Sequence, residues 1–311
     1  MRKKVLVIMN SIETIDISKD STYQLMVAAQ KMGHDLYYVM PGSLSISSSS
    51  AKGHIGNIKL YENKEDFYEI SNISESIIKK FDYVLMRLDP PVDDNYMYIT
   101  YILDIIQKNN IKVINPGNSI RNNNEKLITL NFPKHIPETI VTCSTKELKN
   151  FLLKYKKIIL KPLNLMGGRS IYLLDENDKN ANVIFEDMTK LDSKYIMAQE
   201  YLPESEKGDK RIIIINGKVF KEAVIRVPSS DDHRGNIASG GTIRKYILNK
   251  KEISICEEVA LYLKKERIIF AGIDMIGEKI TEVNITSPTC IAEINKFHNL
   301  NLGEIFWKEV L

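Results

Sequence analysis

Hydrophobic and polar positions in the first third of the chain alternate between the two periods of regular secondary structure. Strand-like apolar runs occupy residues 4–9, 35–40, 81–87 and 112–115, and amphipathic helical patterns occupy residues 22–32 and 95–108. This succession of strand, helix and strand predicts a parallel sheet with helices on both faces. No GxGxxG string follows the first strand, so the dinucleotide-binding fingerprint is absent.

Residues 41–56 interrupt this alternation with a stretch rich in serine and glycine, which includes four consecutive serines at 47–50. Such a composition is typical of a mobile surface loop. A lid on the substrate side is the alternative interpretation.

The pattern changes after residue 122, where three asparagines precede a short helix predicted at 125–131 and two prolines follow it. A domain boundary is therefore expected near residue 122. Beyond it we expect a small α+β module with a helix at 145–154 and strands at 157–161, 170–174 and 195–199. Strands at 211–215 and 218–226 should form a hairpin around Asn216 and Gly217, a strong turn signal.

Three oxygen-bearing side chains interrupt two apolar runs near the C-terminus. Residues 268–276 and 280–285 are typical of strands, and they carry Asp274, Glu282 and Asn284. Residues two apart on a strand share a face, so Glu282 and Asn284 point one way while their apolar neighbours point into the core. Two carboxylates and an amide, without His or Cys, suit a hard cation such as Mg²⁺ that also holds nucleotide phosphates. A solvated polar strand face is the alternative.

The turn between these two strands makes the metal hypothesis testable. A three-residue loop at 277–279 places Asp274 opposite Glu282 on one face. A two-residue loop would place Thr281 opposite Asp274, and a slip of one residue turns Glu282 to the other face. The metal hypothesis therefore predicts an odd-numbered loop.

Composition narrows the possible classes of protein. The chain has 311 residues, enough for two or three domains, and its apolar runs are strand-sized rather than the roughly 20 residues of a membrane helix. A net charge of +3 is too small to indicate nucleic-acid binding. Cys143, Cys256 and Cys290 form no CxxC pair, which favours reduced thiols in a cytosolic protein. Five scattered His residues give no zinc-like spacing.

Cationic and glycine-bearing segments complete the candidate chemistry. Lys161 ends a predicted strand just before Gly167 and Gly168, where backbone N–H groups and an ammonium can meet phosphate oxygens. The segment 227–244 is long, basic and glycine-bearing, as expected of a loop that closes over anions. Ordinary turns and solvated charges are the alternatives for each segment alone. Together with the carboxylate set, they favour phosphoryl transfer, because metal and cations stabilise the developing charge.

Several strings carry a more specific signal. They are MRLDPP at 86–91, Lys161-Pro162 with MGG at 166–168, GDKR at 208–211, RGN at 234–236 with Gly240-Gly241, GID at 272–274, and TEVN at 281–284 with TSPT at 286–289. In these strings and in their order, the chain resembles bacterial glutathione synthetase, an ATP-grasp ligase. The Asp, Glu and Asn set occurs across ATP-grasp enzymes generally, whereas MRxDPP and TSPT are narrower signals.

The resemblance implies an N-terminal α/β domain with a parallel sheet, followed by a two-part ATP-grasp module of a lid and a C-terminal domain. We place these parts at residues 1–122, 123–202 and 203–311, and ATP is expected between the last two. The chain departs from the family's glycine loop at Asn164 and Leu165, where the family usually has an acidic residue and a further glycine.

The resemblance also implies roles for individual residues. On the nucleotide side, Lys126 and Lys161 correspond to phosphate-contacting lysines, Gly167 and Gly168 to the phosphate-covering loop, Glu200, Tyr201 and Leu202 to the adenine-side hinge, and Asp209 to the ribose-side acid. The Mg²⁺ ligands correspond to Asp274, Glu282 and Asn284. Positions near the transferred phosphate and the acyl substrate correspond to Arg211, Arg226, Arg234 and Asn236, and the peptide side to Arg87, Ser287, Pro288 and Thr289.

The activity that the resemblance implies is ATP-dependent joining of γ-glutamylcysteine to glycine through an acyl phosphate, with ADP and phosphate as products. Mg²⁺ is the expected metal, with Mn²⁺ as an alternative. A cytoplasmic homotetramer that binds neither nucleic acid nor membrane is the expected state. The rival interpretations are a ligase for another amino acid, such as a D-alanine–D-alanine or glutamate ligase, a nucleotide-binding regulator without turnover, and a structural or nucleic-acid module.

Overall fold

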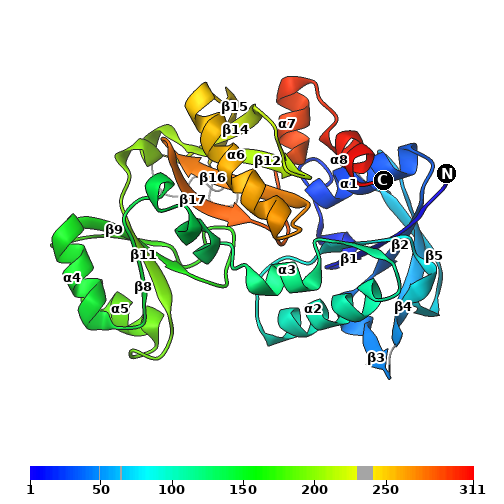
Figure 1. Cartoon of the computed structure of the whole chain (residues 1–311), viewed down its shortest axis with the longest axis horizontal. Helices are drawn as coiled ribbons and strands as arrows, with labels where there is room; N and C mark the ends of the chain where they lie inside the picture. The colour runs from blue at the N-terminus through cyan, green and yellow to red at the C-terminus, as the bar shows by residue number, and fades with distance from the viewer. Residues whose placement is uncertain (49, 64, 230–240) are drawn as a thin grey trace.

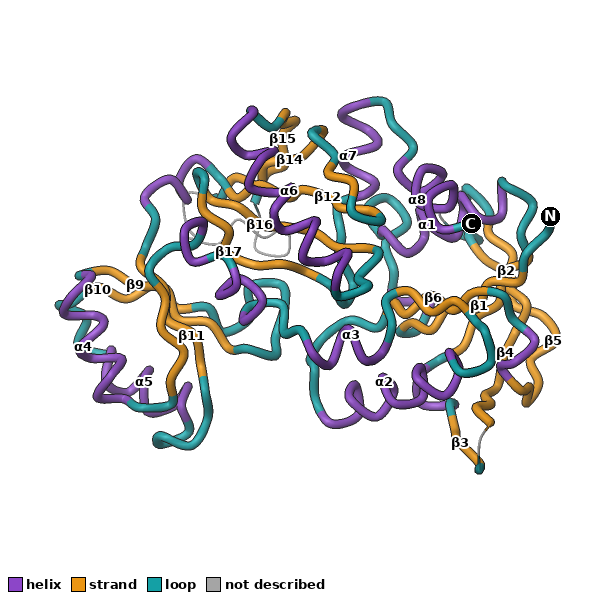
Figure 2. Tube along the Cα trace, viewed as in Figure 1, coloured by secondary structure: helices purple, strands orange, loops and turns teal. Residues whose placement is uncertain are grey.

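The computed structural model describes residues 1–48, 50–63, 65–229 and 241–311, which fold around three sheets (Figure 1). A four-stranded module lies at one end of the molecule and a seven-stranded N-terminal sheet at the other, with a six-stranded C-terminal sheet between them. Figure 2 shows that helices cover the outer surfaces of these sheets. No helix among the described residues combines the length and the apolar character needed to cross a membrane.

The N-terminal sheet has the strand order β3-β4-β2-β1-β6-β7, with β5 beside β4. Its elements are β1 (Lys4–Met9), α1 (Ser21–Lys31), β2 (Asp35–Val39), β3 (Ser45–Ser47), β4 (Ser50–Leu60), β5 (Tyr68–Ile77), β6 (Tyr83–Arg87), α2 (Asp94–Gln107), β7 (Lys112–Ile114) and α3 (Gly117–Asn122). The parallel sheet predicted from the sequence is confirmed for β2, β1, β6 and β7. Side chains alternate along β1, so Val5 and Val7 belong to one core layer while Leu6 and Ile8 belong to the layer that contains α2.

The prediction of a surface loop at residues 41–56 is wrong. This stretch contains β3 and the first half of β4, which pair in antiparallel fashion and extend the sheet. Ala51 and Ile55 are buried among the residues that pack on α2. Ile58 and Leu60 in the second half of β4 are buried as well, and pairing with β2, β3 and β5 supplies the backbone hydrogen bonds of this long strand.

The four-stranded module is antiparallel, with the strand order β10-β9-β11-β8. Its elements are β8 (Thr139–Thr142), α4 (Thr145–Tyr155), β9 (Lys157–Pro162), β10 (Tyr172–Asp175), α5 (Ala181–Thr189) and β11 (Ile196–Glu200). Leu148, Phe185 and Ile158 lie in its own small core. The predicted α+β module is thus present, and Ser144 caps α4 by accepting a hydrogen bond from Glu147 N.

The C-terminal sheet has the strand order β15-β14-β12-β16-β17, with β13 beside β12. Its elements are β12 (Asp209–Ile215), β13 (Lys218–Val219), β14 (Glu222–Val227), β15 (Thr242–Ile247), α6 (Lys250–Lys265), β16 (Phe270–Ile276), β17 (Lys279–Asn284), α7 (Ile291–His298) and α8 (Leu302–Val310). The hairpin predicted at Asn216 and Gly217 is confirmed, since both residues have positive φ and Ile215 pairs with Lys218. The sequence pattern had not predicted α6, although Asn249 and Glu252 form a capping box at its start.

Short 3-10 turns connect several of these elements. They are Ile12–Thr14, Pro41–Ser43, Ile78–Lys80, Leu127–Asn131, Pro133–His135 and Pro203–Lys207. The helix predicted at residues 125–131 is one of them and begins two residues later than predicted.

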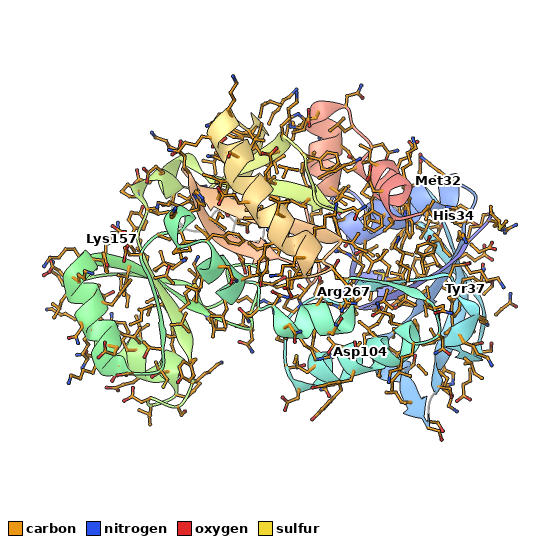
Figure 3. All side chains as sticks on the ribbon, viewed as in Figure 1. Met32, His34, Tyr37, Asp104, Lys157 and Arg267 are labelled. Carbon is orange, nitrogen blue, oxygen red and sulfur yellow. The ribbon has the colours of Figure 1, made fainter. Side chains whose placement is uncertain are left out.

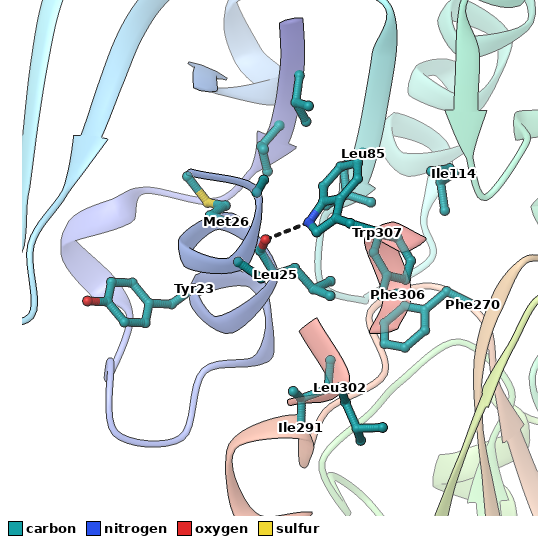
Figure 4. Packing of buried hydrophobic residues seen from close by; sticks show 14 of the residues in the cluster. Tyr23, Leu25, Met26, Leu85, Ile114, Phe270, Ile291, Leu302, Phe306 and Trp307 are labelled. Atoms are coloured by element: carbon teal, nitrogen blue, oxygen red, sulfur yellow. Dashed lines mark hydrogen bonds between the residues drawn. The ribbon is translucent and has the colours of Figure 1, made fainter. Parts of the chain in front are cut away.

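The last helix of the chain packs back onto the N-terminal sheet (Figure 4). Trp307 is fully buried, and its Nε1 donates to Leu25 O of α1 at 2.8 Å. Phe306 packs edge-on against Phe270 of β16. This core contains side chains from both the N-terminal and the C-terminal sheets, so the two sheets are packed against one shared cluster.

Two further contacts fix the N-terminal domain against the C-terminal sheet. The buried side chain of Asn115 donates to Phe270 O at 2.7 Å and Ile285 O at 2.8 Å, and its Oδ1 accepts from Ile269 N and Phe270 N. At the surface, Asp104 of α2 and Arg267, which follows α6, line the same shallow pocket (Figure 3). The register of β16 therefore depends on the end of β7.

Candidate active site

A cavity of about 530 Å³ opens where the three sheets meet. The predicted site residues on its wall are Arg87, Lys126, Lys161, Gly167, Gly168, Glu200, Tyr201, Leu202, Asp209, Arg211, Arg226, Asp274, Glu282, Asn284, Ser287 and Thr289. Pro288 does not line the cavity, although its carbonyl oxygen accepts a hydrogen bond from Arg87. Arg234 and Asn236 lie outside the described residues.

The register of β16 and β17 places Asp274 directly opposite Glu282, as the metal hypothesis requires. The three-residue loop behind that prediction is wrong, because Ile276 pairs with Lys279 and leaves only two loop residues. A β-bulge corrects the register: Met275 pairs with Ile280, which leaves Thr281 as the extra residue. Thr281 Oγ1 donates to Asp274 O at 3.3 Å across this bulge.

Asp274 is the centre of a buried charge network. It accepts two hydrogen bonds from Arg211, at 2.6 Å and 3.0 Å, and lies 3.0 Å from Arg226 Nη2. Arg226 also donates to Asp209. Burial opposes ionisation of Asp274, but the two guanidinium groups hold its pKa below the ordinary value. Burial raises the pKa of Asp209 to about 6.

The two lysines reach the cavity from different segments, Lys126 from just before the 3-10 turn Leu127–Asn131 and Lys161 from β9. Lys126 Nζ donates to Glu282 Oε1 and to Leu165 O, both at 2.8 Å. Burial would lower the pKa of Lys126, but the charge of Glu282 and its hydrogen bond raise it above the ordinary value. Lys161 Nζ donates to Gln199 Oε1 at 2.6 Å, and burial lowers its pKa.

The donor set on β16 and β17 fits a hard cation shared with phosphates. Asp274, Glu282 and Asn284 supply only oxygen ligands or an amide from neighbouring strands. Among the described residues, no group of three or more His, Cys, Asp or Glu forms a metal cage. Mg²⁺ is commonly held by one or two carboxylates together with substrate phosphates, so a cage is not needed.

The glycine loop and the hinge face the cavity from the four-stranded module. Gly167 and Gly168 both have positive φ, a conformation that side chains disfavour, and a Cβ on Gly167 would meet nothing within 4 Å. In the hinge, Glu200 N donates to Glu138 O and Tyr201 N to Lys157 O. Both N–H groups already donate hydrogen bonds within the four-stranded module. Backbone carbonyl groups and the side chain of Leu202 therefore remain for contacts with a nucleobase.

Arg87 joins the N-terminal strand β6 to the C-terminal loop. Its Nε donates to Thr22 Oγ1 and its Nη2 to Pro288 O, both at 2.9 Å. Its Nη1 has no hydrogen-bond partner among the described residues, although the side chain is buried. Burial lowers the pKa of Arg87. An unpaired buried donor at a cavity wall is suited to an anionic group of a ligand.

The loop predicted at 227–244 is shorter than expected, because Val227 belongs to β14 and residues 242–244 belong to β15. Its central residues, 230–240, lie outside the described part of the chain.

Sequence reasoning missed several ionisable residues on the cavity wall, among them Asp20, Asp89, Glu125 and Glu293. Asp20 caps α1 by accepting from Tyr23 N at 2.6 Å. One signal was available for Asp20, since an Asp near the start of a predicted helix is a usual N-cap, and α1 begins at Ser21, one residue earlier than predicted. Glu125 gave no such signal, because its partners lie about 160 residues further along the chain.

Two family models match the chain. Residues 3–121 match the N-terminal domain of prokaryotic glutathione synthetase, and residues 125–299 match the ATP-grasp domain of the same family. Similar relatives include the glutathione synthetases of Buchnera aphidicola subsp. Acyrthosiphon pisum and of Escherichia coli O157:H7. The first is 39% identical over 299 residues, 96% of this chain and 93% of the relative. The second is 38% identical over 291 residues, 94% of this chain and 92% of the relative.

Solved structures agree on the fold. D-cycloserine synthetase DcsG matches with a TM-score of 0.69 at 10% identity and 98% coverage of each chain. The ATP-grasp ligase PsnB with its minimal precursor matches with a TM-score of 0.64 at 14% identity and the same coverage. The predicted ATP-grasp architecture is thereby confirmed. With both family models matched and relatives near 38% identity over most of its length, the chain belongs to the prokaryotic glutathione synthetase family.

Proposed function

We propose that this protein joins γ-glutamylcysteine to glycine at the expense of ATP and releases ADP and phosphate. The observation that carries the proposal is the single cavity on which both lysines, the carboxylate pair and the peptide-side residues converge. Membership of the glutathione synthetase family supports the choice of substrates. No Ser-His-Asp or Cys-His arrangement was found in the sequence to suggest another reaction.

Asp274, Glu282 and Asn284 would hold Mg²⁺, or Mn²⁺ in its place, and the ion would neutralise charge on the terminal phosphates. Lys126 and Lys161 would contact phosphate oxygens, and the loop with Gly167 and Gly168, where a Cβ on Gly167 would meet nothing within 4 Å, would cover the phosphates. The hinge residues Glu200 to Leu202 and the acidic Asp209 would face the base and the ribose.

The reaction has two steps. An oxygen of the cysteinyl carboxylate attacks the γ-phosphorus, the bond to the bridging oxygen breaks, and ADP leaves with that electron pair. The glycine amine, having lost one proton to solvent, then attacks the acyl carbon, the acyl C–O bond breaks, and phosphate leaves with that electron pair and takes up the second amine proton. Arg226, whose Nε has no partner among the described residues, would donate to the negative charge that develops in both steps. Arg211 would stabilise the same charge from the other side of Asp274, and Arg234 and Asn236 are proposed to act near the acyl phosphate.

On the peptide side, the free Nη1 of Arg87 would bind a carboxylate of the dipeptide, and Ser287 and Thr289 would position its backbone. Pro288 would act through its carbonyl, which holds Arg87 in place. We also propose the division into residues 1–122, 123–202 and 203–311, a cytoplasmic location and a homotetrameric assembly.

The test is ADP release from ATP with γ-glutamylcysteine and glycine, run with Mg²⁺, with Mn²⁺ and with a chelator. Release should require both amino-acid substrates and the metal. ADP release with another amino acid in place of glycine would identify a different ligase. ATP binding without release for any pair would identify a regulator rather than an enzyme.

A further inference from the structure

Glu125 is a buried carboxylate on the cavity wall that the proposed chemistry does not use. It lies between α3 of the N-terminal domain and the 3-10 turn Leu127–Asn131, directly before Lys126. Only 7% of the residue is exposed. A charged group with so little contact with water needs several hydrogen bonds to remain in place.

Those hydrogen bonds all come from one stretch of the C-terminal domain. Glu125 Oε1 accepts from Ile285 N at 2.8 Å, from Thr286 N at 2.9 Å and from Thr286 Oγ1 at 2.7 Å. The backbone oxygen of Glu125 accepts from Val283 N at 2.9 Å. Glu125 therefore accepts four hydrogen bonds from three residues, Val283, Ile285 and Thr286, by both its backbone and its side chain.

This stretch connects two groups of site residues. Before it stand Glu282 and Asn284 on β17, and after it stand Ser287 and Thr289, which line the cavity without any regular secondary structure to hold them. Backbone outside helices and strands depends on side chains for its conformation. In this loop the carboxylate of Glu125 replaces the missing ladder partner of β17 at the point where the strand ends.

We propose that Glu125 is a positioning residue that fixes residues 285–289 and thereby sets the affinity for the peptide substrate. It acts through Thr286 and the backbone, and touches neither the nucleotide nor the metal in this role. The inference rests on the proposed function for the identity of the ligand. In this role Glu125 keeps Ser287 and Thr289 in a fixed position relative to Glu282 and Asn284 of β17.

The experiment compares Glu125→Gln and Thr286→Val with a matched control, Glu252→Gln. Glu252 is a buried carboxylate of the C-terminal domain whose partners are Lys210, Tyr246 and the backbone of Asn249, all away from the cavity wall. Thermal unfolding, kinetic constants for each substrate, and calorimetric affinity for γ-glutamylcysteine in the presence of a non-hydrolysable ATP analogue are measured for all three variants.

Each positioning variant should raise KM and Kd for γ-glutamylcysteine by about tenfold, because a charge-assisted hydrogen bond of this kind is lost or weakened. KM for ATP should change by less than about threefold, since Lys126 keeps its bonds to Glu282 and Leu165. The two substitutions act on the same side-chain hydrogen bond, from Thr286 Oγ1 to Glu125 Oε1. In a Glu125→Gln/Thr286→Val double variant, Kd for γ-glutamylcysteine should therefore rise by less than the product of the two single effects. Glu252→Gln should lower the melting temperature but leave the kinetic constants and the Kd for γ-glutamylcysteine unchanged.

Unchanged dipeptide affinity in Glu125→Gln, with a lower melting temperature as in the control, would show a purely structural residue and overturn the inference. Equal rises in KM for ATP and for dipeptide would overturn it as well. A wild-type protein that neither binds nor consumes γ-glutamylcysteine would instead overturn the proposed function together with this inference.

Discussion

Replacing Arg226 with alanine tests the electrostatic account of the site. The side chain is 4% exposed, donates to Asp209, and lies 3.0 Å from Asp274. Its Nε has no partner among the described residues. Loss of a donor that stabilises charge in the transition state lowers kcat by about 10²- to 10³-fold, or roughly 2.7–4 kcal/mol. We therefore expect a fall of at least about 10²-fold in kcat.

The same substitution should leave the fold intact. Asp274 keeps its two hydrogen bonds from Arg211, so only Asp209 loses its cation. Burial already raises the pKa of Asp209 to about 6, and without Arg226 this carboxyl should take up a proton near neutral pH. The stability loss should then stay below the roughly 3–5 kcal/mol typical of breaking a buried ion pair.

The assay is ADP release at saturating substrates, with Arg244→Ala as the control. Arg244 is an exposed arginine on the neighbouring strand β15, opposite Ile225. It should retain wild-type kcat. If Arg226→Ala changed KM but left kcat as in the control, Arg226 would bind substrate equally in the ground state and would have no part in stabilising the reacting charge.

Three other substitutions give separate tests. Glu282→Gln should abolish ADP release while the melting temperature stays near that of the wild type, and a variant with retained activity would remove Glu282 from the metal site. Asp274→Asn should destabilise the protein at neutral pH. The pKa of Asp274 is lowered in the folded state, so its ionised carboxylate stabilises the fold above the ordinary carboxylate pKa of about 4. This stabilisation is lost as pH falls toward the folded pKa. The difference in melting temperature should therefore shrink near pH 3 (~1 unit below that ordinary pKa), and a constant difference would contradict the assigned charge state. Asn115→Leu leaves four buried backbone groups without their partner, so urea unfolding should show a loss of at least about 3 kcal/mol, and a loss near zero would mean that water replaces the side chain.

Elements with a strong apolar period could be predicted from the sequence to within a residue or two. The strand Lys4–Met9 has the predicted bounds, and α1 and α2 are each displaced by one residue. The antiparallel strands β3 and β4 were missed because their apolar positions are few and separated by Ser and Gly. Their stability comes from pairing with distant neighbours, which local pattern cannot show.

The candidate site, too, could be predicted from the sequence only in part. Residues at strand ends and in family strings could be located, and those within the described chain line one cavity apart from Pro288. The pairing of Asp274 with Glu282 was predicted for a wrong reason, since a bulge at Thr281 does what an odd loop was expected to do. Bulges depend on the whole strand pair, so the alternation of side chains alone could not reveal this one.

The residues that join the three parts were the hardest to see, and residues 124–126 show why. Asn124 Nδ2 donates to Leu163 O in the glycine loop, Glu125 binds Val283, Ile285 and Thr286, and Lys126 contacts both Leu165 and Glu282. Three neighbouring residues just after the N-terminal domain thus bind both the four-stranded module and the C-terminal sheet. The two partners of each contact are at least 39 residues apart in the sequence, so a local sequence pattern never includes both partners. The geometry of the cavity therefore depends on this junction, where Lys126 is proposed to contact phosphate while Asn124 and Glu125 act through other residues of the protein.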